Sequence, residues 1–451
     1  MISRCPMRIR STPRCVRDRA CDWHLAANVA VDATIWDSRA LQQNGPPGQA
    51  LDFMRKSAIS QSGASAVLAA GFLVLFVTGG ARFVIGLTLK PMAEELAWGR
   101  STIGLVVAVF ALVSAACMFI AGRLADRYSP RLVLGGGLAM SAVGIGFMSL
   151  VDAPWQALLL YGGLFAIGNG IASLTPIGVL VNRWFPQRTG LANAVAISGI
   201  GVGQLVMIGG FAAVLVDIGW RPVYGWLGVV HVLLIPLILV AVRSGRDATT
   251  VQESAVHGTL LDALRSKHFA LLAIVFAICG FQDFFVATHV VAFAQDRGVD
   301  TLLAGNLLAF MGLTGLLGVL LAGGWSDRAG PVWATLACFV LRIGLFAAIL
   351  VDQQAPSIAA FALLFGMTFW VTAPLTLIFV RAAFGTAHLG ALSGLIVMIH
   401  HMCGGLGALV GALAFDAQGH YDTVFALMLV LALLAAALTV GLRNASCASR
   451  A

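Results

Sequence analysis

Two polar loops in this chain repeat the same pattern at a fixed spacing, each between long apolar segments. The first reads GRLADRYSP from Gly122 to Pro130, and the second reads GGWSDRAGP from Gly323 to Pro331. The spacing is 323 − 122 = 201 positions, and it is the same for the aspartate, arginine and proline of each loop. Three further pairs have this spacing: Gly79 and Gly280, Phe83 and Phe284, and Gly104 and Gly305. Such a repeat indicates two related halves, as in duplicated helical membrane proteins.

The composition favours a lipid environment. Of the 451 residues, 59% are hydrophobic and only 11% are charged, whereas soluble proteins average about 25% charged residues. So few charges give too little polar surface to coat a soluble globule of this size. The formal net charge is +8, but the basic residues lie in short loops and near the termini. We interpret them as orientation signals and expect no nucleic-acid binding.

Twelve apolar runs are long enough to cross a bilayer as helices. A helix needs about 20 residues to span roughly 30 Å of hydrocarbon, whereas a barrel strand uses about 10 residues of alternating polarity. The runs show no such alternation, so the sequence predicts an all-α membrane protein with twelve transmembrane helices. The runs start near Ala64, Ser101, Leu132, Trp155, Gly190, Arg221, His268, Thr301, Val332, Pro356, Leu389 and Tyr421.

The loops between the runs differ in positive charge. If the first helix enters from the cytoplasm, the inside loops hold Arg123, Arg127, Arg131, Arg183, Arg188, Arg243, Arg246, Arg265, Lys267, Arg328 and Arg381. The outside loops then hold only Lys90, Arg100, Arg221 and Arg297. The positive-inside rule places both termini in the cytoplasm. We therefore expect a multi-pass protein of the inner (plasma) membrane.

The ends and the middle of the chain lack such apolar runs. Residues 1–60 are rich in arginine and contain no run long enough for a signal peptide or an anchor. We expect a disordered cytoplasmic extension or an over-extended start with Met54 as the true first residue; a regulatory tail is the alternative. The predicted organisation then continues with a six-helix half at 61–243, a polar linker at 244–267, a second six-helix half at 268–443 and a tail at 444–451.

The eight cysteines form neither a disulfide framework nor a metal-binding spacing. Some of them lie inside predicted spans and the others near the termini. We therefore expect no metal and no cofactor.

The paired loops between spans two and three and between spans eight and nine resemble those of the major facilitator superfamily, over residues 64–442. Three segments narrow the resemblance to the branch of bacterial relatives of monocarboxylate transporters and oxalate/formate exchangers: GGARF at 79–83, KPMAEELAWGR at 90–100 and NRWFPQRTGLA at 182–192. The resemblance implies two pseudo-symmetric six-helix bundles, related by an axis along the membrane normal. Substrate would lie between the bundles near the midplane, and the bundles would rock to give alternating access.

The chain departs from this branch in one respect. The related carriers are similar in placing a charged residue in the eighth span, but residues 301–322 carry none. Asp283 in the seventh span could substitute for it. A specificity for lactate or oxalate is therefore not carried over.

The repeated loops are candidates for gating. Glycine permits a tight turn, and an aspartate is favoured beside a helix N-terminus. We expect Asp126 and Asp327 to latch the cytoplasmic side when the cavity faces outward. The alternative is that these charges only make short loops soluble and set the topology. The candidate gating residues are Gly122, Asp126, Arg127, Gly323, Asp327 and Arg328.

Arg82 in the first span and Asp283 in the seventh are opposite charges at equivalent positions of the two halves. A charge at the centre of a span costs about 2.5–3.5 kcal/mol on insertion scales, so each requires a partner or water. Three interpretations remain open. The residues could form a gating ion pair, Arg82 could bind an anionic substrate while Asp283 exchanges a proton, or the pair could be static. The planar fork of arginine suits a carboxylate, which favours the second.

Other polar or aromatic side chains lie at useful depth. His400 and His401 are about 16 Å into the eleventh span at 1.5 Å per residue, and histidine titrates near physiological pH. Adjacent helical residues point in directions about 100° apart, so at most one of them can face a cavity squarely. Arg342 in the ninth span has no evident role. Asn169, Gln204, Gln282 and Trp370 complete the candidates, and each could instead hold helices together.

The sequence predicts a secondary active transporter for a small organic solute, most simply a carboxylate anion, coupled to H⁺ or to a counter-solute. No GxxxxGK[ST] loop is present, so a gradient must supply the energy. A multidrug exporter of the same fold is the main alternative. An intramembrane enzyme or haem protein would use histidines that lie at different depths, and a non-transporting sensor would not need paired latch loops. We expect a monomer.

Overall fold

The computed structural model describes residues 47–185, 189–242, 260–384 and 389–448. Throughout these ranges the regular elements are helices. The chain divides into two compact units, Met1–Gln61 and Ser62–Ala451, and the second contains all the candidate membrane spans. Of the first unit, the structure describes the start of α1 (Pro47–Ala81).

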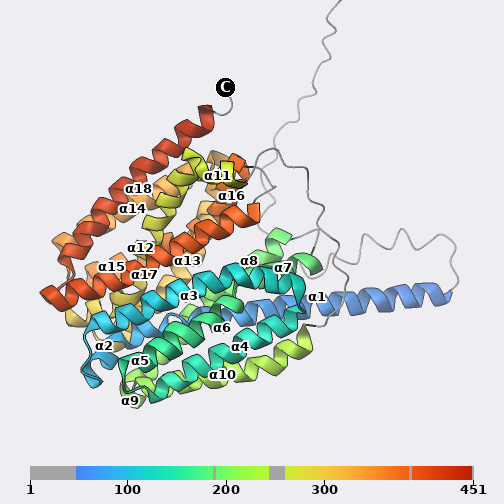
Figure 1. Ribbon diagram of the computed structural model, residues 1–451, viewed down its shortest axis with the longest axis horizontal. Helices are drawn as coiled ribbons and strands as arrows, with labels where there is room; N and C mark the ends of the chain where they lie inside the picture. The colour runs from blue at the N-terminus through green and yellow to red at the C-terminus, as the bar shows by residue number, and fades with distance from the viewer. Residues whose placement is uncertain (1–46, 186–188, 243–259, 385–388, 449–451) are drawn as a thin grey trace, which may run out of the picture. The chain divides into compact units, whose positions relative to one another are not determined.

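The second unit begins within α1, and the helices of its first half appear in Figure 1 from blue to yellow-green. They are α2 (Val84–Glu95), α3 (Arg100–Arg127), α4 (Pro130–Gly146), η2 (Phe147–Leu150), α5 (Pro154–Ala157), η3 (Leu158–Phe165), α6 (Ala166–Ile171), α7 (Leu174–Trp184), α8 (Thr189–Gly203), η4 (Gln204–Ile208), α9 (Gly209–Ile218) and α10 (Trp220–Ala241).

The helices of the second half run from yellow to red in Figure 1. They are α11 (Leu260–Arg265), α12 (Lys267–Asp296), α13 (Thr301–Ala329), α14 (Pro331–Val351), α15 (Ala355–Phe369), α16 (Thr372–Phe384), α17 (Leu389–Gln418) and α18 (Asp422–Ala448).

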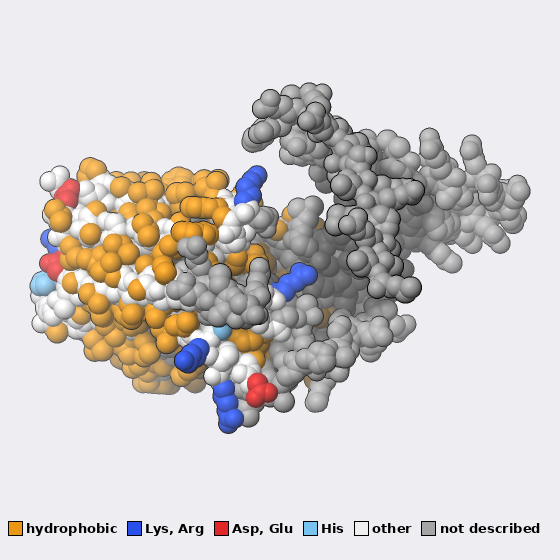
Figure 2. Space-filling view, turned by 90° about the horizontal axis from the view of Figure 1, so that it is seen from above, with side chains coloured by type: hydrophobic (Ala, Val, Ile, Leu, Met, Phe, Trp, Pro, Cys, Tyr) orange, Lys and Arg blue, Asp and Glu red, His pale blue; other side chains and the backbone are white. Residues whose placement is uncertain are grey.

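The predicted spans are present at the expected places. Within the described residues, 11 helical segments are long and apolar enough to cross a membrane. The remaining predicted span, the tenth, consists of the short apolar helix α15 followed by α16. Figure 2 shows hydrophobic side chains over most of the visible described surface, with charged side chains toward its two ends. This distribution is what a protein surrounded by lipid requires.

Proline and glycine set several helix boundaries. Pro331 occupies the first turn of α14, where its missing N–H costs no hydrogen bond. Gly330 precedes it with a φ of 87°, a conformation that favours glycine. The Asp300 side chain accepts hydrogen bonds from the backbone N–H groups of Leu302 and Leu303, which caps α13. The local sequence therefore explains where the eighth span starts and where the ninth begins.

Three spans are interrupted in their middle. The first breaks at Arg82 and Phe83, the fourth at Ala172 and Ser173, and the tenth after Phe369. In the fourth and tenth spans a proline follows the break, Pro176 and Pro374. Each proline lacks the N–H that would bond the carbonyl four residues earlier, so the helix is weakest there. Irregular backbone at membrane depth is tolerated where it is buried in protein or lines a cavity.

The two halves make equivalent contacts across their interface. Gly104 of α3 lies so close to α17 that an added Cβ would meet the Cβ of Ala412. Gly305 of α13, at the equivalent position 201 residues later, lies in the same way against Ala212 of α9. Figure 1 shows α3 beside α17. The predicted fold class, twelve membrane helices in two pseudo-symmetric bundles, is therefore confirmed.

Two terminal boundaries differ from the prediction. Residues 47–60, expected within a disordered extension, are helical and belong to α1. Pro47 fits a first helical turn, and helix-favouring residues such as Ala50 and Leu51 follow it. At the other end, α18 continues to Ala448 through the expected tail. Most of the predicted linker, 244–267, lies outside the described residues, and α11 forms its end.

Candidate functional site

A cavity lies where the broken first span meets the helices of the second half. Its lining comes from α2 and the break before it, α3, η3, α12 and the end of α15. The lining residues are Arg82, Phe83, Ile85, Val107, Phe110, Tyr161, Phe284, Ala287, Thr288 and Phe369. Both halves contribute, so a solute in this cavity would contact both.

Arg82 brings a positive charge to this cavity. The break between α1 and α2 places it there, and its backbone carbonyl accepts a hydrogen bond of 2.8 Å from the Tyr161 hydroxyl. Its guanidinium lies over three aromatic rings, with centroid distances of 4.7 Å to Phe83, 5.2 Å to Trp370 and 5.9 Å to Phe284. Among the described residues it has neither an ion pair nor a side-chain hydrogen bond. The cation is therefore held by ring faces, and its N–H donors remain available.

Asp283 has a different partner from the one that the repeat suggested. Its Oδ1 accepts a 2.6 Å hydrogen bond from Nη2 of Arg342, and both side chains are buried. Arg342 also donates to the side chain of Gln282 and to both the hydroxyl and the carbonyl of Thr368. An ion pair between Arg82 and Asp283, which two of the three open interpretations required, is thus absent from the described contacts. Arg342, which had no evident role in the sequence, faces inward from α14 and neutralises the aspartate.

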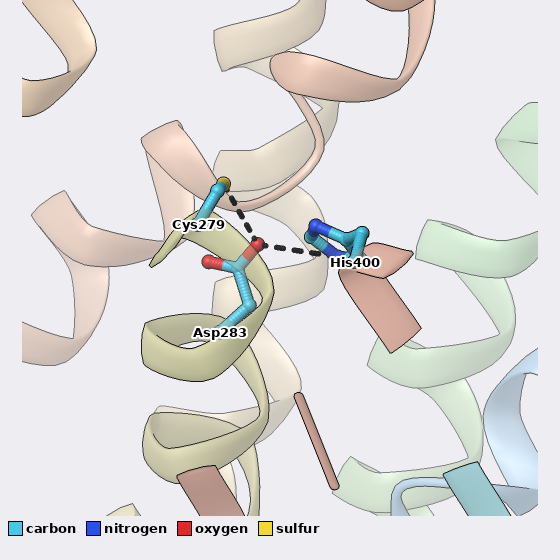
Figure 3. Close-up of side chains that lie close together, drawn as sticks. All are labelled: Cys279, Asp283 and His400. Atoms are coloured by element: carbon cyan, nitrogen blue, oxygen red, sulfur yellow. Dashed lines mark hydrogen bonds and ion pairs between the residues drawn. The ribbon is translucent and has the colours of Figure 1, made fainter. Parts of the chain in front are cut away.

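The remaining contacts of Asp283 involve a thiol and an imidazole (Figure 3). The Cys279 thiol donates to Oδ2 at 3.4 Å, and Nε2 of His400 lies 3.8 Å from the same oxygen. These three side chains could supply ligands to a metal ion, since their ligand atoms lie within 4.8 Å of one another. The guanidinium of Arg342 occupies the other carboxylate oxygen and would repel a cation. The arrangement fits an internal ion pair better than a metal site.

The charges at mid-span do not cancel. Asp283 and Arg342 compensate each other, which leaves the positive charge of Arg82 without a counter-charge in contact among the residues that the structure describes. An uncompensated cation in a low-dielectric region attracts anions strongly. The cavity is therefore suited to a negatively charged ligand.

A second group of charges joins the two halves at one end of the molecule. Arg100, at the start of α3, pairs with Asp296 at 2.7 Å, donates to the Tyr421 hydroxyl at 2.7 Å and lies 3.6 Å from the Phe415 ring centroid. Lys90 also pairs with Asp296, at 3.0 Å. The sequence gives no sign of this group, because its members come from α2, α3, α12, α17 and the residue before α18, and meet only when the halves pack together.

Comparison with known proteins shows the family of this chain. The model that describes the Major Facilitator Superfamily matches residues 71–408 and, in a second match, residues 272–446. This chain belongs to that superfamily.

Several members of the Major Facilitator Superfamily are similar in sequence or in structure. Monocarboxylate transporter 13 of Rattus norvegicus is 26% identical over 342 residues, which are 74% of this chain and 77% of the relative. The oxalate:formate antiporter of Oxalobacter formigenes is 24% identical over 233 residues, which are 50% and 54% of the two chains. A bacterial homologue of the human lysosomal transporter Spinster, inward-facing and occupied, has a TM-score of 0.71 at 15% identity, covering 84% of this chain and 97% of that chain. The predicted superfamily and branch are confirmed, and the structural likeness shows the fold.

The two candidate histidines, His400 and His401, lie behind the cavity wall. Nδ1 of His400 lies 3.2 Å from the Phe276 carbonyl oxygen, and Nδ1 of His401 lies 3.0 Å from that of Val397. Both rings pack edge-on against Phe284, which lines the cavity. His400 reaches Asp283, whereas Nε2 of His401 is buried without a hydrogen-bond partner among the described residues. His400 is therefore the histidine connected to the ion pair.

The three predicted amides hold helices together and do not line the cavity. Asn169 donates to the Thr78 carbonyl at 3.0 Å, and Gln204 donates to the Leu308 carbonyl across the two halves at 2.8 Å. Gln282 bonds the Met428 carbonyl as well as Arg342. Of the two interpretations of these residues, substrate contact and a role between helices, these hydrogen bonds support the second. Depth along a helix, which the sequence shows, does not determine the direction in which a side chain points.

Trp370 lies beside the cavity, next to the break in the tenth span. Its ring contacts the Arg82 cation, and its indole N–H is buried without a hydrogen-bond partner in the described structure. The sequence analysis did not include Tyr161, Phe284 or Thr288 among its candidates. Aromatic residues are frequent in apolar spans, so composition alone gave no signal for them.

The candidate gating residues lie within helices. Gly122, Asp126 and Arg127 belong to the last turns of α3, and Gly323 and Asp327 to those of α13. The expected tight turn at these glycines is therefore wrong, because the helices continue through the motif. The side chains of Asp126, Arg127 and Asp327 lie outside the described part of the structure. Arg328 is exposed and donates to the carbonyl of Gly324 at 3.0 Å.

Proposed function

We propose that this protein is a secondary active transporter that carries a small carboxylate anion by alternating access. The observation that carries the proposal is the Arg82 guanidinium, which has no ion pair within the described parts of the chain, in a cavity formed by both halves. Its fork of N–H donors matches the two oxygens of a carboxylate. Two relatives, a monocarboxylate transporter and an oxalate:formate antiporter, support a carboxylate as the solute.

The ion pair behind the cavity supports a coupling role. Asp283 lies between the cation of Arg342 and the imidazole of His400, so a proton could be exchanged at this carboxylate or imidazole. We propose that translocation is coupled to H⁺ at this cluster, with a counter-solute at Arg82 as the alternative. If transport is coupled to H⁺, a pH gradient drives it. If transport is an exchange, only carboxylate on the opposite side of the membrane drives it.

The proposal is tested by binding and uptake with Arg82→Gln. In purified protein, formate, acetate and benzoate are screened by thermal shift, since a ligand at a hundred times its Kd stabilises by about 2.7 kcal/mol. We expect at least one of them to stabilise the wild type and none to stabilise Arg82→Gln. Arg131→Gln, which removes an exposed arginine remote from the cavity, is the matched control and should behave like the wild type. Equal stabilisation of Arg82→Gln would refute carboxylate binding at this residue.

A multidrug exporter remains the second candidate, because the cavity lining is mainly aromatic and aliphatic. Such an exporter would bind lipophilic cations, which Arg82 repels. If rhodamine-type cations stabilise the protein and carboxylates do not, the exporter is the correct function.

A further inference from the structure

We propose that the transported solute is a carboxylate with a single negative charge and a flat, aromatic body. This inference rests on the proposed function and specifies its substrate class.

The walls of the cavity are largely aromatic. Phe110 and Tyr161 of the first half lie together, with ring centroids 5.1 Å apart. Phe83 packs against Phe369 at 5.9 Å, and Phe284 enters from α12. Aromatic rings prefer offset or edge-to-face contacts with other rings, at centroid distances of 4.5–7 Å. A ligand ring between these side chains would find such partners in both halves.

The polar groups that line the cavity can bind one carboxylate, and none remains for a second carboxylate on the same solute. Arg82 is the cation of the described lining, and the Tyr161 hydroxyl is already bonded to the Arg82 carbonyl. Thr288 lines the cavity, and its hydroxyl has no hydrogen-bond partner among the described residues, so it is a candidate donor to a carboxylate oxygen. A second carboxylate would lie against apolar walls without a partner, which costs several kcal/mol or more. Dicarboxylates should therefore be excluded.

The rings around Arg82 also explain how a monocarboxylate is oriented. Cation–π contacts attract the guanidinium without satisfying its N–H donors as a carboxylate would. The carboxylate is then fixed at Arg82, and the body of the solute must lie along the remaining rings. The cavity is small, about 30 Å³, so a ring that enters it lies in contact with these side chains.

The test compares four probes on the purified full-length protein: benzoate, cyclohexanecarboxylate, terephthalate and formate. Benzoate and cyclohexanecarboxylate have the same carbon number and charge, and differ in flatness and in the ring electrons. We expect the Kd of benzoate to be roughly three- to tenfold lower than that of cyclohexanecarboxylate, the factor that aromatic pairs add beyond area burial. Terephthalate should not bind at concentrations that saturate with benzoate.

Phe284→Leu should reduce this preference, because it removes one ring of the cavity and keeps an apolar side chain. Phe346→Leu is the matched control, since Phe346 is fully buried in α14 and does not line the cavity. If formate binds through Arg82 but benzoate does not, or if benzoate and cyclohexanecarboxylate bind equally, the inference fails and the proposed function stands. If no carboxylate binds in an Arg82-dependent way, the proposed function itself fails.

A separate observation supports a second inference, that Arg100 closes one end of the cavity. We infer that Arg100, Asp296 and Asp416 form a lock between the halves on the face that the positive-inside pattern places outside. The Asp416 carboxylate of α17 accepts the backbone N–H groups of Arg100 and Ser101, at 2.9 Å and 2.8 Å. An acceptor from one half thus caps the first turn of a helix in the other.

The lock is partly shielded from water and held by neutral as well as charged groups. The side chain of Arg100 is 8% exposed, so its pair with Asp296 is screened less than a surface ion pair. Burial raises the pKa of the Tyr421 phenol, so this residue stays a neutral acceptor for Arg100. His289, the titratable group that faces Tyr421 from α12, bonds its hydroxyl at 3.1 Å and the Ala408 carbonyl at 2.8 Å. Opening of this face must break all these contacts together.

The lock is tested by access to the cavity from that face. In Thr288→Cys protein, Arg100→Gln should increase labelling by a membrane-impermeant maleimide severalfold, after subtraction of labelling in the variant that retains Thr288. Asp416→Asn is the second variant, and it should act in the same direction. Arg131→Gln should have no effect. Unchanged labelling in either folded lock variant would overturn the inference.

Discussion

At the scale of single residues, the ion pair of Asp283 with Arg342 determines the charge of the cavity. The scarcity of charges in apolar runs identified Arg82, Asp283 and Arg342 from the sequence alone. Their pairing was not predictable, because a spacing of 201 residues relates equivalent depths and carries no information on helix rotation. The rotation of α14 brings Arg342 to Asp283 and thereby leaves Arg82 free. The same uncertainty of direction explains why substrate contact and a role between helices both stayed open for the amides.

Removal of Arg342 should destabilise the protein strongly. Arg342→Gln leaves the Asp283 carboxylate buried without its counter-charge, and breaking a buried pair in this way costs about 3–5 kcal/mol. We expect the thermal midpoint of the detergent-purified protein to fall clearly. The double variant Asp283→Asn/Arg342→Gln removes both charges and should recover much of the loss. A double variant as unstable as the single one would show that the pair does not determine the effect.

Replacement of Arg82 by lysine tests geometry separately from charge. Lysine keeps the positive charge but loses the planar fork, so one of two parallel hydrogen bonds to a carboxylate is lost. A hydrogen bond to a charged group contributes about 1.5–3 kcal/mol, which corresponds to a roughly 10- to 100-fold higher Kd in Arg82→Lys. Calorimetric titration of the best carboxylate found in the screen gives this ratio. An unchanged Kd would mean that Arg82 acts as a point charge.

At the scale of helices, the spans were predicted well and their interruptions were not. The length of an apolar run is fixed by the bilayer, so predicted starts such as Thr301 and Leu389 coincide with those of α13 and α17. The breaks in the fourth and tenth spans have a signal in Pro176 and Pro374, which the sequence analysis did not use. The break at Arg82 follows Gly79 and Gly80 without a proline. Its position depends on packing against the other helices, which one sequence does not show.

Close approach of α12 and α17 should make Gly280 intolerant of a side chain. An added Cβ at this residue would meet the carbonyl oxygen of His400, which is backbone and cannot move independently. We expect Gly280→Ala to destabilise the protein by about 1–3 kcal/mol, as overpacking does elsewhere. Gly136→Ala is the control, because an added Cβ there meets nothing within 4 Å. Thermal unfolding of both variants measures the difference, and equal midpoints would contradict the close packing.

At the scale of the whole molecule, the repeat predicted the two related halves and their helical architecture. It could not predict which charges meet between them. Arg100, Asp296 and Asp416 are ordinary loop-end residues in the sequence, and they become partners only through the docking of the halves. The equivalent contacts at Gly104 and Gly305 show that the duplicated pattern extends to the interface itself.

The orientation of the molecule follows from its loop charges and remains a prediction. A fluorescent protein fused to the C-terminus should be bright, and alkaline phosphatase fused there should be inactive, because both termini are expected in the cytoplasm. Phosphatase inserted after Gly298, between the seventh and eighth spans, should be active. Activity at the C-terminus and none at Gly298 would reverse the orientation and place the Arg100 lock inside.

The ion pair between Asp283 and Arg342 has a consequence for how membrane voltage acts on the transport cycle. A monovalent anion bound at Arg82 neutralises the charge of that residue. When the site is empty, Arg82 leaves one positive charge in the low-dielectric centre of the protein. Each elementary charge moved across 100 mV is worth about 2.3 kcal/mol. Because the proposed coupling proton at the Asp283 cluster adds a positive charge to the loaded carrier, membrane voltage would act on the loaded step as well as on the return of the vacant carrier.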